Sequence, residues 1–286
     1  MTPSRHAQSG ALRLSFSTGA LYHMPLRTVF LLAREAGLDG VELVDGPEVV
    51  LRGPPYVLRL SCEYGLPVFS VHPPVLPYPG MQDARRTLRR LVWVAQGVQC
   101  NLVVLHTPKT ASTEHPQWRA FLQALHEHSN PGVRVSLENA GFFRSTDGRY
   151  LLHDVHALSA FARLHDLPVT FDTAHAGTTP FPLLESLAAF NGRIVNVHLS
   201  DLVRRRIFPD WRPLHTFLLH HQMPGKGVLP LADLVRVLLR SGYSGPLTLE
   251  ISPTALRAWS VARVRSGLAE AVRFVRELEA AEAGKV

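Results

Sequence analysis

The stretch VRVSLE, residues 133–138, decides the fold, because an apolar run that closes on an ionisable residue recurs along the whole chain. Continuous runs of valine, leucine and isoleucine are typical of strands that are buried on both faces. An ionisable group is costly inside such a strand, so we expect it at the strand end, facing a shared cavity. The other runs are LRLSF (12–16), GVELV (40–44), PVFSVH (67–72), NLVVLH (101–106), PVTFD (168–172), IVNVH (194–198) and PLTLE (246–250). All but the first have a closing acid or histidine, namely Glu42, His72, His106, Glu138, Asp172, His198 and Glu250.

The spacing of these closing residues predicts how the runs are connected. Most steps between them are about 26–34 residues, the length that one strand, one helix and two loops occupy. Eight such units form a (β/α)8 TIM barrel of the α/β class, whose active-site face carries polar residues at the C-terminal strand ends. A chain of 286 residues fits one barrel well. We therefore predict a single barrel over residues 11–286, preceded by a flexible polar tail of residues 1–10.

Amphipathic segments between the apolar runs predict the crossover helices. Gly53, Pro54 and Pro55 interrupt one of them, and we expect that helix to kink or restart there. The segment 201–228 is surplus to the repeat, and long loops on this face of a barrel commonly shape the substrate pocket. The predicted helical segments are 24–37, 48–65, 82–99, 116–129, 153–166, 182–190, 230–242 and 254–281.

Composition narrows the class of protein. Two cysteines, Cys62 and Cys100, form no disulfide framework, which favours a reducing, cytoplasmic setting. The first ten residues lack the apolar segment of a signal peptide, and no run of 18 apolar residues predicts a membrane span. The net charge of +7 is compatible with anionic ligands such as phosphates or nucleic acid, but a bias toward arginine on solvated helix surfaces is the favoured explanation.

The last four runs predict a metal site. Glu138, Asp172, His198 and Glu250 close consecutive runs, so a barrel brings three carboxylates and an imidazole together. Three converging carboxylates repel one another, and a cation relieves that repulsion. Mixed oxygen and nitrogen donors suit one divalent ion, Mn²⁺, Mg²⁺, Co²⁺ or Zn²⁺.

Local motifs carry a resemblance to the xylose isomerase-like barrel superfamily. The motifs are SVHPP, VVLHTP, SLENAG, FDTAHAG, VNVHLSD, HHQMPGKG and LTLEIS, within residues 12–252. That superfamily holds sugar and sugar-phosphate isomerases and epimerases, inosose dehydratases and endonuclease IV. The motifs and their order are specific to the superfamily but not to one reaction within it.

The resemblance implies roles for individual residues. It makes Glu138, Asp172, His198 and Glu250 the metal ligands, and Glu138 and Glu250 the catalytic pair that removes and returns a proton next to a carbonyl. Substrate-binding positions that it implies are Glu42, His72, His106, His175 and Arg204, and His221 matches a further metal or substrate ligand. His72 and His106 also match histidines that bind an additional metal in the nuclease. For Glu42, a salt bridge at the barrel rim is an equal alternative.

Three classes of function stay open at this stage. The favoured one is a divalent-metal-dependent isomerase, epimerase or related lyase that acts on a small sugar, sugar phosphate or polyol through a metal-stabilised enediolate. The second is an endonuclease IV-like AP endonuclease, for which Leu219 stands where the ninth zinc ligand, an aspartate, is expected; His220 or Asp201 is a possible substitute. The third is a non-catalytic ligand-binding barrel. We expect a small-molecule substrate, no membrane partner, a homo-oligomer as one possible assembly, and nucleic acid only under the second reading.

Overall fold

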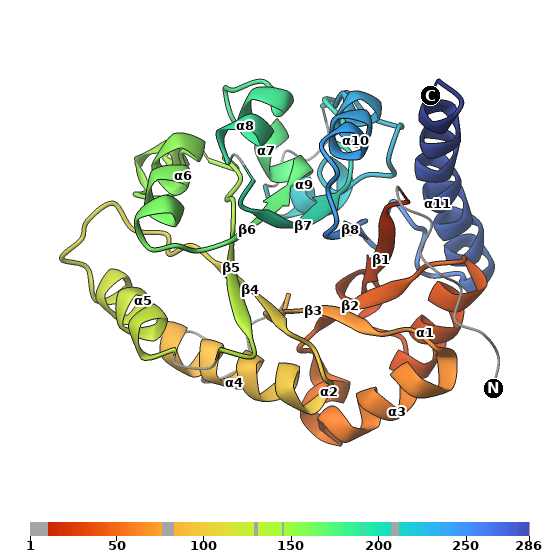
Figure 1. The fold of residues 1–286 in the computed structure, drawn as a ribbon, viewed down its shortest axis with the longest axis horizontal. Helices are drawn as coiled ribbons and strands as arrows, with labels where there is room; N and C mark the ends of the chain where they lie inside the picture. The colour runs from red at the N-terminus through yellow and green to blue at the C-terminus, as the bar shows by residue number, and fades with distance from the viewer. Residues whose placement is uncertain are drawn as a thin grey trace.

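The computed structural model describes residues 11–75, 83–128, 131–144, 146–190, 192–206 and 212–285, so the predicted tail of residues 1–10 lies outside the described residues. Eight parallel strands follow one another in sequence order and close into a barrel. The predicted (β/α)8 fold is therefore confirmed (Figure 1). The strands are β1 (Arg13–Ser17), β2 (Gly40–Val44), β3 (Val68–His72), β4 (Leu102–His106), β5 (Arg134–Glu138), β6 (Val169–Asp172), β7 (Ile194–Leu199) and β8 (Pro246–Leu249).

Helices form an outer ring around the strands (Figure 1). Their buried apolar faces pack on the barrel and give one continuous core. The α-helices are α1 (Leu26–Glu35), α2 (Pro47–Arg52), α3 (Pro54–Tyr64), α4 (Ala84–Gly97), α5 (Pro116–Glu127), α6 (Val155–Leu164), α7 (Thr173–Gly177), α8 (Leu183–Ala189), α9 (Arg212–Leu218), α10 (Leu231–Arg240) and α11 (Val261–Ala283), with 3₁₀ turns η1 (Thr18–Leu21) and η2 (Asp147–Arg149). No helix in the described part of the chain is long and apolar enough to cross a bilayer.

The interior of the barrel is polar, which differs from the expectation that the strands are apolar on both faces. Ser15 and Thr248 share a hydrogen bond of 2.7 Å, and so do Ser136 and Thr170. Thr248 also donates to Asn196. Because side chains alternate along a strand, the apolar residues between these positions face the helices. The interior polar layer comprises Ser15, Glu42, Ser70, Ser136, Thr170, Asn196 and Thr248, all fully buried.

One helical segment follows the sequence prediction, and others depart from it. The interrupted helix is two helices, because Gly53 takes a φ of 72° between α2 and α3, as expected of a restart. The last helix begins at Val261 rather than near residue 254, since Arg257 adopts a left-handed φ of 53° and ends a separate turn. The surplus segment contains α9, which the sequence pattern did not predict.

Asp201 organises the surplus segment. Its buried carboxylate accepts hydrogen bonds from four backbone N–H groups, those of Leu202, Gly225, Gly227 and Leu229, at 2.8–3.1 Å. Its backbone also pairs with Gln222 in an antiparallel bridge. A carboxylate with both oxygens committed in this way is a loop anchor. It is therefore not a free substitute for the missing ninth zinc ligand.

Candidate metal centre

Four donors meet where strands β5 to β8 end. Glu138, Asp172, His198 and Glu250 each offer one atom, and these four atoms lie within 4.8 Å of one another. His198 Nδ1 lies 2.8 Å from Glu250 Oε2, 3.7 Å from Glu138 Oε1 and 3.8 Å from Asp172 Oδ2. The strand-end spacing thus predicted a real convergence, and Glu138 and Glu250 approach each other as the barrel requires.

The hydrogen bonding of these atoms fits a cation. Asp172 Oδ2, His198 Nδ1 and Glu250 Oε2 are buried and have no hydrogen-bond partner, although His198 Nδ1 and Glu250 Oε2 are in ion-pair contact. Buried polar atoms are normally satisfied, so three unsatisfied atoms that face one point need a ligand there. Carboxylate oxygens and one imidazole nitrogen are a suitable donor set for Mn²⁺, Mg²⁺, Co²⁺ or Zn²⁺.

Glu42 lies behind His198 rather than at the mouth of the site. Its carboxylate oxygen Oε2 is 2.9 Å from His198 Nε2, and it also accepts a hydrogen bond from Ser70. Strand β2 continues to Val44, which pairs with His72, so Glu42 sits one layer deeper than a strand-end residue. Both Glu42 and His198 are fully buried, which places this ion pair inside the barrel and not at its rim. The contact makes Nδ1 the nitrogen that His198 turns to the other donors.

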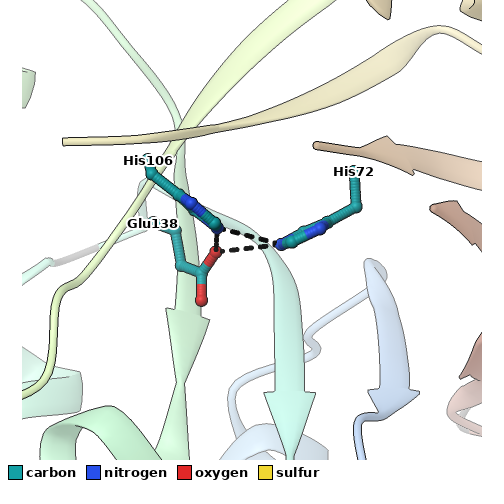
Figure 2. A group of neighbouring side chains, drawn as sticks. All are labelled: His72, His106 and Glu138. Carbon is teal, nitrogen blue, oxygen red and sulfur yellow. Dashed lines mark hydrogen bonds and ion pairs between the residues drawn. The ribbon is translucent and has the colours of Figure 1, made fainter. Parts of the chain in front are cut away.

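A second group of donors joins the ends of β3, β4 and β5 (Figure 2). His106 Nε2 lies 3.0 Å from Glu138 Oε2 and 3.1 Å from His72 Nε2. His72 Nδ1 donates a hydrogen bond to the carbonyl oxygen of Pro73 at 2.7 Å. Nε2 is therefore the nitrogen of His72 that is left to coordinate a metal ion. Glu138 belongs to both groups. His72 and His106, which were predicted to bind substrate or a second metal, therefore lie next to the first donor group.

A third group consists of Asp172, His175 and His221. His175 Nδ1 lies 2.9 Å from the carbonyl oxygen of Asn139, and His221 Nδ1 lies 4.0 Å from Asp172 Oδ2. The resemblance placed the ninth zinc ligand of the nuclease at position 219, where this chain has leucine. The structure adds Asp172 as a third donor, while Leu219 is buried. Among the described residues, three donor groups are thus linked through two shared carboxylates.

Charge in the site is arranged around the imidazoles. Burial alone would raise the pKa values of Glu138 and Glu250, but neighbouring histidines, His106 for Glu138 and His198 for Glu250, lower both well below the usual range. Burial raises the pKa of Asp172 to about 6, although His175 opposes the shift. Burial would lower the pKa of His198, but Glu42 and Glu250 raise it well above its usual value. The charges of the buried carboxylates and of His198 therefore stabilise one another within the site.

Arg204 lies apart from the donor groups. It is exposed and lines a groove of about 420 Å³ together with Thr179, Phe181 and the loop before α10. In the described part of the chain, none of the donor residues lines that groove. Two of the aromatic residues of this loop, Phe208 and Trp211, fall outside the described residues. The predicted role of Arg204 in substrate binding consequently has no contact with the centre to support it.

Asn139 is a site residue for which the sequence motifs predicted no role. Its side-chain amide donates to the backbone carbonyl of Asp172 and accepts from the Asp172 N–H, at 3.0 and 2.7 Å. Its own carbonyl holds His175, so one residue fixes a donor at the end of β6 and another in α7. The signal in the sequence was its position directly after the ligand Glu138, within SLEN. Pairing between β5 and β6 was needed to see what it does.

Comparisons with known proteins agree with this fold. The family model described as xylose isomerase-like TIM barrel matches residues 30–278. An uncharacterized protein of Mycobacterium tuberculosis is 28% identical over 286 residues, covering 93% of this chain and 97% of that protein.

Two solved structures with known names are similar in fold. D-allulose 3-epimerase from Methylomonas sp., solved with D-allulose, has a TM-score of 0.64 at 17% identity, covering 95% of this chain and 99% of its own. An AP endonuclease of family 2 from Brucella melitensis has a TM-score of 0.64 at 19% identity, covering 87% and 98%. At these identities the likeness establishes the fold alone.

Proposed function

The chain belongs to the xylose isomerase-like TIM barrel family, and from that premise we propose that it is a divalent-metal-dependent isomerase, epimerase or related lyase. Its substrate in this proposal is a small sugar, sugar phosphate or polyol. The observation that carries the proposal is the convergence of Glu138, Asp172, His198 and Glu250 within 4.8 Å, with three of their buried atoms unsatisfied. The epimerase among the structural neighbours is consistent with it.

The residues divide the proposed chemistry. Glu138, Asp172, His198 and Glu250 would hold the ion, which when bound supplies a Lewis acid that stabilises an enediolate next to a carbonyl. Glu138 is almost fully buried and contacts His72, His106 and His175, so its charge is already engaged. Glu250 is 23% exposed and has an unsatisfied oxygen. Glu250 is therefore better placed to take a proton from the substrate, and Glu138 to return one through the same pocket.

The test combines metal analysis with a substrate screen. We expect the purified protein to bind one or more divalent ions, and Glu138→Gln to lose that binding together with turnover of ketoses or inososes. Glu114→Gln is the matched control, because Glu114 is exposed and lies outside the donor groups. Full metal occupancy in Glu138→Gln would contradict the proposed ligand set. Metal binding without turnover of any sugar or polyol would contradict the reaction class.

A specific observation favours a second candidate, an endonuclease IV-like AP endonuclease. The three donor groups are linked by Glu138 and Asp172, an arrangement suited to several metal ions. A structural neighbour is named as an AP endonuclease. This candidate predicts cleavage of a duplex at an abasic site and binding that weakens steeply with salt. Sugar turnover with no cleavage of that duplex would eliminate it.

A further inference from the structure

His106 is the most exposed of the donor residues, ahead of Glu250 at 23% and His175 at 18%. The side chains of His72, Glu138, Asp172 and His198 are at most 6% exposed. The side chain of His106 is 54% exposed. His106 Nε2 points to Glu138, as Figure 2 shows, so the rest of its ring is left to face outward. A substrate that approaches from the β3 and β4 side meets His106 first.

A cavity of about 610 Å³ adjoins His106 on that side. It lies between the end of β4 and the first turns of α4 and α5, which contribute Thr87 and Phe121. Four prolines line it, Pro73, Pro74, Pro108 and Pro116, and most of its wall is apolar. Lys109 and Gln117 supply hydrogen-bond donors at its edge.

The size and the wall both indicate a bulky occupant. Cavities of roughly 300–1,000 Å³ with apolar walls and a few polar groups are typical of sites for drug-sized ligands. Proline rings and Phe121 offer flat apolar surfaces to a ring, and the polar edge fits oxygen substituents on it. A free monosaccharide that reaches the carboxylates would leave this space unused.

We propose that the cavity is a subsite for a second ring of the substrate, so that the protein acts on a sugar or polyol joined to a further ring. The inference rests on the proposed function, because it names the substrate class of the same centre. In this arrangement the reacting carbon lies at the carboxylates and the second ring passes His106 into the cavity. Specificity then comes from Pro73 and Pro74 after β3 and from the segment between β4 and α5, which are separate from the loop that carries Arg204.

Matched pairs of probes test the subsite by calorimetry on the metal-loaded protein. Each pair is a free hexose and its 4-nitrophenyl glycoside, taken over several epimers. We expect at least one glycoside to bind at least tenfold more tightly than its free sugar. Ala120→Trp, which fills the cavity from α5, should remove the difference. Gln123→Trp on the exposed face of the same helix is the control and should keep it.

Gln117→Trp at the edge of the cavity is the second blocking variant, in case Ala120→Trp does not fold. Equal affinities within every pair, including no detectable binding of either probe, would overturn the subsite. Retention of the preference in a folded blocking variant would also overturn it. Failure of the proposed function can be told apart from failure of the subsite. It would appear as metal binding that survives Glu138→Gln, and that measurement does not use the sugar probes.

Discussion

The two sides of the barrel mouth differ in burial and in chemistry. At the ends of β5 to β8, Glu138, Asp172, His198 and Glu250 converge in a buried cluster with unsatisfied atoms. At the ends of β3 and β4, His106 is half-exposed and a cavity with largely apolar walls opens beside it. Burial strengthens electrostatic interactions, whereas an open apolar wall suits recognition by shape. The comparison separates a buried side with most of the proposed cation ligands from an open side that we propose selects the substrate.

Among the substitutions considered, removal of a carboxylate from the buried side of the barrel mouth should reduce metal affinity the most. Asp172 belongs to two donor groups, so we expect Asp172→Asn to weaken metal binding by more than about 100-fold, beyond the effect of an outer partner. Asp166→Asn is the control, because Asp166 is 93% exposed. Calorimetric titration with Mn²⁺ or Zn²⁺ measures the change, and unaltered affinity would break the assignment of this side.

Glu42→Gln should have the next largest effect. The carboxylate of Glu42 holds His198 Nε2 from below, so its loss should lower metal affinity about 10–100-fold without removing a ligand. The absorption spectrum of the Co²⁺ form should shift as well, because the orientation of His198 changes. Glu63→Gln, at an exposed ion pair, should change neither. An unchanged Co²⁺ spectrum in Glu42→Gln would show that Glu42 only fills space.

Raising the pH should destabilise the metal-free protein by a smaller amount. Burial alone would lower the pKa values of His72 and His175, but contacts with Glu138, together with the charges of Glu42 near His72 and of Asp172 near His175, raise them to about 9 and about 10. A histidine whose pKa is raised in the folded state stabilises the folded protein fully at pH values below the ordinary pKa near 6.5. This stabilisation is lost as the pH rises through the folded-state pKa. The melting temperature of metal-free protein should therefore fall between about pH 7 and pH 10.

Saturating metal should remove most of this pH dependence, because bound imidazoles are already neutral. Scanning calorimetry of metal-free and loaded protein across that range measures both curves. Parallel curves would mean that these histidines are not in the metal centre.

Substitution of Arg204 should have the smallest effect. Arg204 is exposed and shares its groove with none of the described donor residues. We expect Arg204→Ala to leave metal affinity unchanged and to raise KM for a sugar or polyol by less than about tenfold, as for a solvated charged hydrogen bond. A larger loss would show that Arg204 contacts the substrate, and would shift specificity from the β3 and β4 side to Arg204.

The amino-acid sequence by itself determined the barrel and the residues that meet at its centre. Strand length, period and spacing are local properties, and parallel strands in a closed sheet must end on one face. Glu138, Asp172, His198 and Glu250 could therefore be placed together without coordinates. Even the polar interior layer was present in the pattern, since Ser70, Ser136, Thr170, Asn196 and Thr248 each stand two residues before a strand-end group.

Tertiary structure decided which atoms these residues use and what surrounds them. Glu42 is a support for His198 and not a rim residue, because the register between β2 and β3 pairs Val44 with His72. Asp201 anchors the loop after β7 because its carboxylate accepts hydrogen bonds from four backbone N–H groups, the most distant of them 28 residues along the chain. His106 lies next to a cavity because the N-terminal parts of α4 and α5 line that cavity together with the end of β4. Such contacts depend on register and loop path across the sheet, and the local pattern of one strand contains neither.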